Sequence, residues 1–308
     1  MTTAGAARRE WLLVAVPAVW LGLLLAWALA RPAGPEAESI AGAVALLAGM
    51  TVLGLSTVKL LGGEELTPPV LRLASVVAAV WAVSLLVGAW LGAAERTGLA
   101  PHEVGINDFF RVNGTTAGLI AAMCALAVTL FCAVWIRYPS LIAPEAVGAL
   151  AALGLLIGPV TGHLGQLTGG ALLIAVHVLA ASWWCGSLAA LALTVRGRKG
   201  WATVLPVFSR YAQWLVLALI VSGVVAALLE LDSISEVWST GYGRILLAKS
   251  VGMMALLAVA ADQRRRWLPS AHTHRISEQA SLRRAIVEVL LMAVVIGLAA
   301  GLGTTAPS

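Results

Sequence analysis

Apolar residues in this chain form nine long runs that are separated by short polar connections. The runs cover residues 11–30, 40–61, 70–93, 114–136, 144–160, 170–194, 204–229, 243–262 and 283–302. A helix needs ~20 apolar residues to cross a bilayer core, and the runs lack the alternating pattern of membrane β-strands. The pattern therefore predicts an all-α, polytopic transmembrane bundle of about nine spans. We divide it into an N-terminal region, 1–143, with four spans, and a region 144–308 with five.

The connections between the runs are too short to hold a soluble domain. The longest connection lies around residues 94–113 and is predicted to be a loop. Composition agrees with this view, because 60% of the residues are hydrophobic, 11% are charged and the mean hydropathy is +0.93. A soluble domain has ~25% charged residues, so a soluble globular enzyme is excluded and membrane lipids are the expected surroundings.

The distribution of charge predicts how the bundle is oriented. With the N-terminus in the cytoplasm, 15 of the 20 Lys and Arg residues fall on the inner side, and eight of the 15 acidic residues fall on the outer side. Cytoplasmic connections are enriched in Lys and Arg. We therefore predict a multi-pass protein of the cytoplasmic membrane with its N-terminus inside and its C-terminus outside. The basic pI of 9.6 follows from this topology and does not require nucleic acid as a partner.

The first apolar run also has features of a cleavable signal peptide. Arg8 and Arg9 precede it, and Ala28-Leu29-Ala30 near its end is similar to a cleavage site. The run is long for a signal peptide, which favours a retained helix. A retained helix keeps the N-terminus attached to the bundle, whereas cleavage would remove it together with the first run.

The sequence contains no P-loop, no dinucleotide-binding glycine pattern, no zinc-protease histidine pair and no nucleophile-elbow serine. Polar groups inside apolar spans are costly, so they are the candidates for function. His177 lies well inside the run 170–194 and shares a helix face with Trp184, seven residues on. His163 lies at the outer end of the preceding run. The two histidines could share one metal ion or bind opposite faces of a haem. Alternatively, His177 only packs against a neighbouring helix through a hydrogen bond, and His163 is a solvated loop residue.

Several sulfur-containing residues lie at depths comparable with that of His177. Thioether, thiolate and imidazole groups suit Cu(I). For the methionines the alternative is ordinary core packing. The residues concerned are Cys185, Met50, Met123, Met253, Met254 and, near the centre of the last span, Met292.

Two charged residues, Lys249 and Glu288, are predicted to lie within the membrane. Lys249 is near the outer surface, where Glu230 or Asp232 is the expected ion-pair partner. Glu288 is close to the inner surface, below an arginine-rich loop. Both residues are interpreted either as structural ion pairs or as groups that set the local field or gate. The loop also contains His272-Thr273-His274, which we interpret as solvated.

The part of the chain from Thr161 onward resembles the copper-resistance D (CopD) family of membrane proteins. The resemblance is carried by seven short motifs: Gly162-His163; His177 with Trp184 and Gly186; Phe208-Ser209-Arg210; Ser222-Gly223; Tyr242-Gly243-Arg244 with Lys249; Arg264-Arg265-Arg266 with Pro269; and Leu282-Arg283-Arg284 with Glu288. Cys185-Gly186-Ser187 departs from the family, which tends to have paired glycines after the tryptophan.

The resemblance implies that the protein handles copper at the cytoplasmic membrane in partnership with an extracytoplasmic copper chaperone. Longer members continue into a module similar to a cytochrome oxidase assembly factor, which implies an oxidase-assembly partner. We accordingly predict a transporter and not an enzyme; a haem protein with a redox or assembly role, or a non-catalytic assembly subunit, are the alternatives. The predicted metal ligands are His163, His177, Met253, Met254 and Cys185, and the predicted charge or gating residues are Lys249, Glu288, Glu230 and Asp232.

Overall fold

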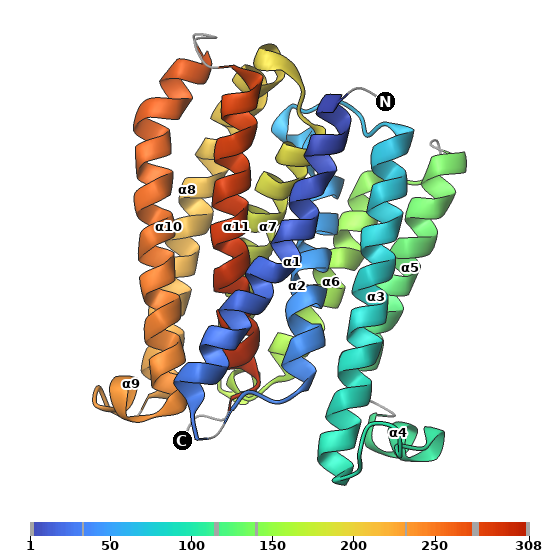
Figure 1. Ribbon diagram of the computed structural model, residues 1–308, viewed down its shortest axis with the longest axis vertical. Coiled ribbons are helices and arrows are strands. Elements are labelled where there is room, and N and C mark those ends of the chain that lie inside the picture. The colour runs from blue at the N-terminus through green and yellow to red at the C-terminus, as the bar shows by residue number, and fades with distance from the viewer. Residues whose placement is uncertain are drawn as a thin grey trace.

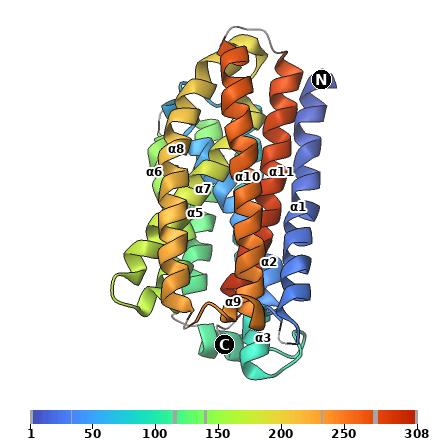
Figure 2. The same cartoon turned by 90° about the vertical axis from the view of Figure 1, so that its left-hand side faces the viewer.

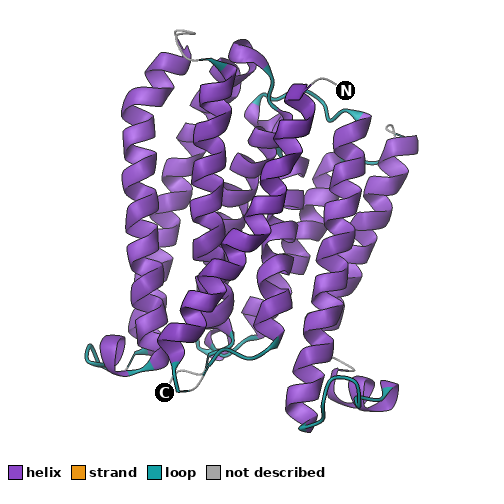
Figure 3. Cartoon of the chain, viewed as in Figure 1, coloured by secondary structure: helices purple, strands orange, loops and turns teal. Residues whose placement is uncertain are grey.

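The computed structural model describes residues 3–32, 34–113, 117–138, 141–231, 233–272 and 277–305. Within these ranges the regular structure is helical, without strands (Figure 3). The long helices are α1 (Thr3–Ala30), α2 (Glu38–Ser56), α3 (Pro68–Thr97), α5 (Ala117–Arg137), α6 (Pro144–Thr161), α7 (Gly170–Thr194), α8 (Gly197–Glu230), α10 (Gly241–His272) and α11 (Glu278–Gly303). The short ones are η1 (Val58–Leu61), α4 (Ile106–Asn113), η2 (Leu164–Gln166) and α9 (Glu236–Ser239).

The long helices run side by side along one axis, and the N- and C-termini lie at opposite ends of the bundle (Figures 1 and 2). Eight of them are long and apolar enough to cross a membrane, and the described side chains of α1 add a shorter apolar stretch, Val14–Ala30. These helices confirm the predicted polytopic bundle. The side of the membrane on which each end lies stays a prediction.

Several helices extend beyond the apolar runs that predicted them. Helix α7 has the predicted bounds, but α8 begins seven residues before its run and α10 continues ten residues past Asp262. Apolar content marks only the part of a helix within hydrocarbon, whereas backbone hydrogen bonding continues through polar residues in the interface. Hydropathy therefore underestimates the lengths of these helices.

The connection predicted as a loop at 94–113 contains helix α4. Its Phe109 is buried and stacks on Trp90 of α3 with ring centroids 5.2 Å apart, while Ile106 and Phe110 are exposed. Eight residues are too few to give a membrane-span signal. The stacking contact with α3 fixes the helix, and no pattern within the connection predicts that contact.

Helix α2 is the most buried span. In its apolar segment 72% of the residues are buried inside the protein, whereas in the apolar segments of α8 and α10 the share is 11%. Exposed apolar side chains are expected on helices that face lipid. One hydrophobic core joins helices from both predicted regions, for example Trp81 of α3 and Trp184 of α7. The division of the chain into two regions at residues 143 and 144 stays a prediction. Side chains from both regions pack together in this core.

Glycines bring two pairs of helices into backbone contact. A Cβ on Gly22 would overlap the Val294 carbonyl group, which fixes α1 against α11. A Cβ on Gly54 would overlap the Gly186 carbonyl group, which fixes α2 against α7. Small residues allow such close approach in membrane bundles. The second contact determines which side chains of α2 and α7 lie at the same level.

Candidate functional site

His177 lies in the first half of α7, ~10 Å along the helix axis from its first residue, Gly170. The side chain is half-buried, and its Nδ1 is 2.9 Å from the Ser222 hydroxyl of α8. Ser222 donates its own hydroxyl hydrogen to the Ala218 carbonyl oxygen. Because a hydroxyl has one hydrogen, Ser222 must accept from His177, so Nδ1 of a neutral imidazole carries the proton.

This arrangement leaves Nε2 of His177 with the lone pair of the neutral ring. The structure gives Nε2 no hydrogen bond to any of the described residues. Metal-binding histidines commonly use one ring nitrogen for the ion and donate the other N–H to a neighbouring oxygen. The His177–Ser222 pair has the features of such a ligand and its orienting partner.

Gly223 lies directly against the His177 ring. A Cβ on Gly223 would stand 3.6 Å from Cε1 of the ring. The dipeptide Ser222-Gly223, singled out in the sequence only as a motif, is therefore the wall against which His177 packs. Its role was missed because the two segments are 45 residues apart.

Lys249 of α10 lies close enough to His177 to act on it electrostatically. The ammonium group forms no ion pair among the described residues, and Glu230 lies near Tyr242 instead. The expected pair with Glu230 is therefore not seen. Asp232, the other expected partner, lies outside the described residues, so that pairing stays a prediction.

Arg244, three residues into α10, joins this helix to the end of α1. Its guanidinium donates to the Leu29 and Arg31 carbonyl oxygens at 2.7 and 2.9 Å, and also to the Trp238 and Ser239 carbonyl oxygens. Cations stabilise the C-terminal ends of helices, where carbonyl groups lack helical partners. The Tyr242-Gly243-Arg244 motif thus has a structural role at this end of the bundle.

His163 is exposed in the connection between α6 and α7, immediately before η2. No hydrogen bond joins its ring to that of His177, whose Nδ1 is held by Ser222. The shared two-histidine site therefore stays a prediction. Among the described residues there is also no group of three or more His, Cys, Asp or Glu side chains arranged to hold a metal ion.

The sulfur-containing residues separate into exposed and buried ones. Met254 is 65% exposed and Met123 is 61% exposed, so both face the surroundings of the bundle. Met253 is half-buried and packs against the core. Cys185 lines a small cavity together with Met50 and Met292, two residues that the sequence did not single out above the other methionines.

Glu288 is almost completely buried, with 3% of its surface exposed. It lies on α11 one turn before Met292, and its charge acts on the Cys185 thiol. Its neighbour in the chain, Val289, lines this cavity. The depth of Glu288 near the inner membrane surface stays a prediction.

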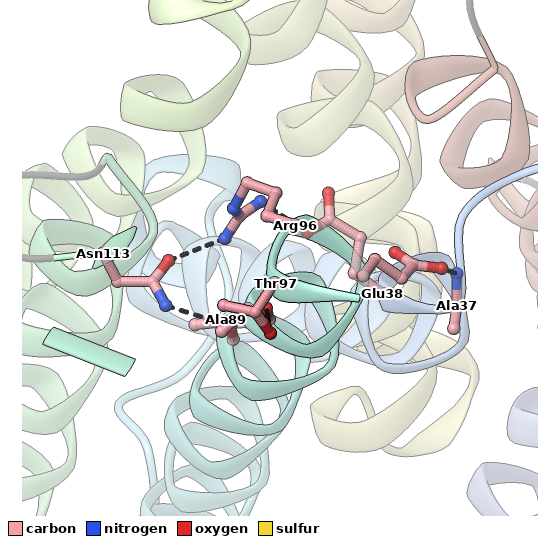
Figure 4. Close-up of polar contacts among 8 residues, drawn as sticks. Ala37, Glu38, Ala89, Arg96, Thr97 and Asn113 are labelled. Carbon is pink, nitrogen blue, oxygen red and sulfur yellow. Dashed lines mark hydrogen bonds and ion pairs between the residues drawn. The ribbon is translucent and has the colours of Figure 1, made fainter. Parts of the chain in front are cut away.

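A second polar cluster joins α2, α3 and α4 at the end of the bundle where His163 lies. Arg96 donates to the Asn113 side-chain oxygen at 2.8 Å and lies 3.9 Å from the Glu38 carboxylate (Figure 4). Asn113 is buried and donates to the Ala89 carbonyl oxygen at 3.2 Å. These contacts fix the position of α4 against α3. They were not predicted, since the polar residues concerned lie at or beyond the ends of the apolar runs.

The helical bundle, its apolar outer surface and its few embedded polar groups define a polytopic α-helical membrane protein. Residues 202–302 match the family model described as copper resistance protein D. This match confirms the predicted resemblance to the copper-resistance D family over that region of the chain. No curated protein and no solved structure matches the chain.

The matched region contains Ser222, Gly223, Arg244, Lys249 and Glu288, but it begins after both His163 and His177. The histidine that the structure places against Ser222 is therefore connected to the family region by a contact between helices. The sequence match itself does not extend to it.

Proposed function

We propose that the protein binds copper within the membrane and passes it across, with His177 as a ligand that receives the ion near the outer surface. The observation that carries this proposal is the contact between His177 and Ser222. It orients the ring, leaves Nε2 as the ligand atom and joins the histidine to the part of the chain that matches the copper-resistance family. An imidazole nitrogen is a suitable ligand for copper ions.

Lys249 would control the affinity of such a site for the copper ion through its charge. A positive charge near His177 opposes binding of a cation, and the repulsion is stronger where water is excluded. Loss or compensation of the Lys249 charge would therefore favour loading of the ion. Approach of an acidic residue, or of an acidic surface of an extracytoplasmic copper chaperone, would provide that compensation.

Copper loading of the purified protein tests the proposal. Wild-type protein in detergent is incubated with Cu(I) and washed, and its copper content and visible spectrum are measured. We expect near-stoichiometric copper that falls in His177→Ala, whereas His102→Ala, a matched control on the exposed connection before α4, retains it.

The same measurements separate the alternatives. A Soret band in protein purified from cells would favour haem binding with a redox or assembly role. Neither copper nor haem in folded wild-type protein would overturn the copper proposal and favour an assembly subunit that acts with an oxidase-assembly partner. Uptake of copper by vesicles containing the protein then distinguishes transport from storage of the ion.

A further inference from the structure

Helices α2 and α7 cross in direct backbone contact at the centre of the bundle. A Cβ on Gly186 would overlap the Met50 carbonyl group, and one on Gly54 would overlap the Gly186 carbonyl group. Cys185 precedes Gly186 in the chain, so this crossing places its thiol at the level of the Met50 side chain. The segment Cys185-Gly186-Ser187, which stands where the family tends to have paired glycines, thus lies where these two helices are in backbone contact.

Helix α11 completes the surroundings of this crossing. Val289, Met292 and Ile296 lie on one face of α11 and enclose a cavity against Met50 and Cys185. The cavity has a volume of about 10 Å³, which is roughly the space that one water-sized body needs. Met50 and Met292 are both buried, with 6% and 1% of their surfaces exposed. Three sulfur-containing residues from three helices therefore line a space of the size that a single ion needs.

We propose that Met50, Cys185 and Met292 form a second copper site, which binds Cu(I) in the middle of the membrane. This inference rests on the proposed function and identifies the site that accepts the ion after His177. Thioether and thiolate ligands select Cu(I), and a site with few oxygen or nitrogen ligands disfavours harder cations. Coordination by the Cys185 sulfur releases its thiol proton, so one proton leaves for each ion bound and copper stays in the Cu(I) state.

Two further features favour a cation at this place. The Glu288 carboxylate lies within electrostatic reach of Cys185, and a negative charge attracts a cation, most strongly where water is excluded. Ser182, one turn before Gly186 on the same face of α7, is fully buried, and its hydroxyl has no hydrogen-bond partner among the described residues. Buried polar atoms without partners are rare. An ion passing along this face would meet this hydroxyl before the sulfur ligands.

Helix α7 contributes a ligand to each of the two copper sites, and these ligands, His177 and Cys185, lie at different depths. Cys185 follows His177 by eight residues, which corresponds to ~12 Å along the axis of α7. Their side chains differ by ~80° around the helix. An ion would thus move from an imidazole near the outer surface to a sulfur site deeper in the bundle, and each step would involve different ligands.

Copper K-edge X-ray absorption, combined with competition for Cu(I) by bathocuproine disulfonate, tests the inference. Met50→Leu, Met292→Leu and Cys185→Ala remove the sulfur atoms one at a time, and Met→Leu conserves volume well enough for the fold to persist. Matched controls are Met123→Leu, which removes an exposed thioether from α5, and Cys132→Ala, which removes a buried thiol from the same helix. Gel filtration and thermal unfolding in detergent identify variants that fail to fold.

We expect wild-type protein to bind copper with sulfur neighbours, and each of the three site variants to weaken that fraction at least tenfold while both controls retain it. His177→Ala should remove the copper with nitrogen neighbours and leave the sulfur-bound ion. A sulfur-bound fraction that persists in folded Cys185→Ala and Met292→Leu overturns the second site and leaves the proposed function intact. Loss of sulfur-bound copper in those variants with no effect of His177→Ala overturns the His177 site instead. Absence of any copper from folded wild-type protein overturns both.

Discussion

Substitution of Ser222 by alanine tests how far the orientation of His177 determines copper binding. The change removes the hydroxyl that accepts from Nδ1 of His177 at 2.9 Å. The Ala218 carbonyl group keeps its place in the helix, so the imidazole N–H is the group that loses its partner. An unsatisfied buried donor costs about 1–3 kcal/mol. Loss of a residue that orients a metal ligand lowers metal affinity about 10–100-fold, which is about 1.4–2.8 kcal/mol at 1.4 kcal/mol for each factor of ten.

The assay is the Cu(I) affinity of the purified variant, measured by competition with bathocuproine disulfonate. Ser250→Ala is the matched control, because its hydroxyl donates to the Leu246 carbonyl oxygen at 2.8 Å in the same way but faces outward. We expect Ser222→Ala to lose about 10–100-fold in affinity and Ser250→Ala to bind as the wild type does. Equal affinities in the two variants would show that the Ser222 contact does not orient a copper ligand.

Three further predictions concern the orientation, the charge near the site and the helix crossing. Reporter tags fused to the N- and C-termini should be cytoplasmic and external respectively, and a report of the same side from both would mean a cleaved first span or a miscounted one. Lys249→Met should tighten Cu(I) binding at His177 by about tenfold, because Lys249 acts electrostatically on His177 and like charges repel by on the order of 1 kcal/mol or more where water is excluded. Unchanged or weaker affinity would exclude repulsion by Lys249. Gly186→Ala should lower the free energy of unfolding by about 1–3 kcal/mol and so lower the melting temperature, because its Cβ would overlap the Met50 carbonyl group. Gly42→Ala, where a Cβ meets nothing within 4 Å, should be neutral, and similar melting temperatures for both variants would refute the argument.

The positions of the spans could be read from the sequence because they depend on local composition. A segment that crosses hydrocarbon must satisfy its own backbone hydrogen bonds as a helix, whatever its neighbours are. For this reason α7 has the predicted bounds, and each of the other eight long helices overlaps one of the predicted apolar runs. His177 was singled out by the same reasoning, since a polar side chain inside an apolar span is evident from the sequence.

The partners of these residues depend on contacts between helices, and a nearly uniformly apolar helix gives little indication of which face is turned inward. Met254 was a predicted ligand and is mostly exposed, while Met50 and Met292 were not chosen and line the cavity with Cys185. The Ser222 contact joins residues 45 positions apart. In hydrocarbon every helix face is compatible with lipid, so hydrophobicity does not orient the helices. The backbone approach of Gly54 and Gly186 does, and that approach exists only when α2 and α7 are packed together.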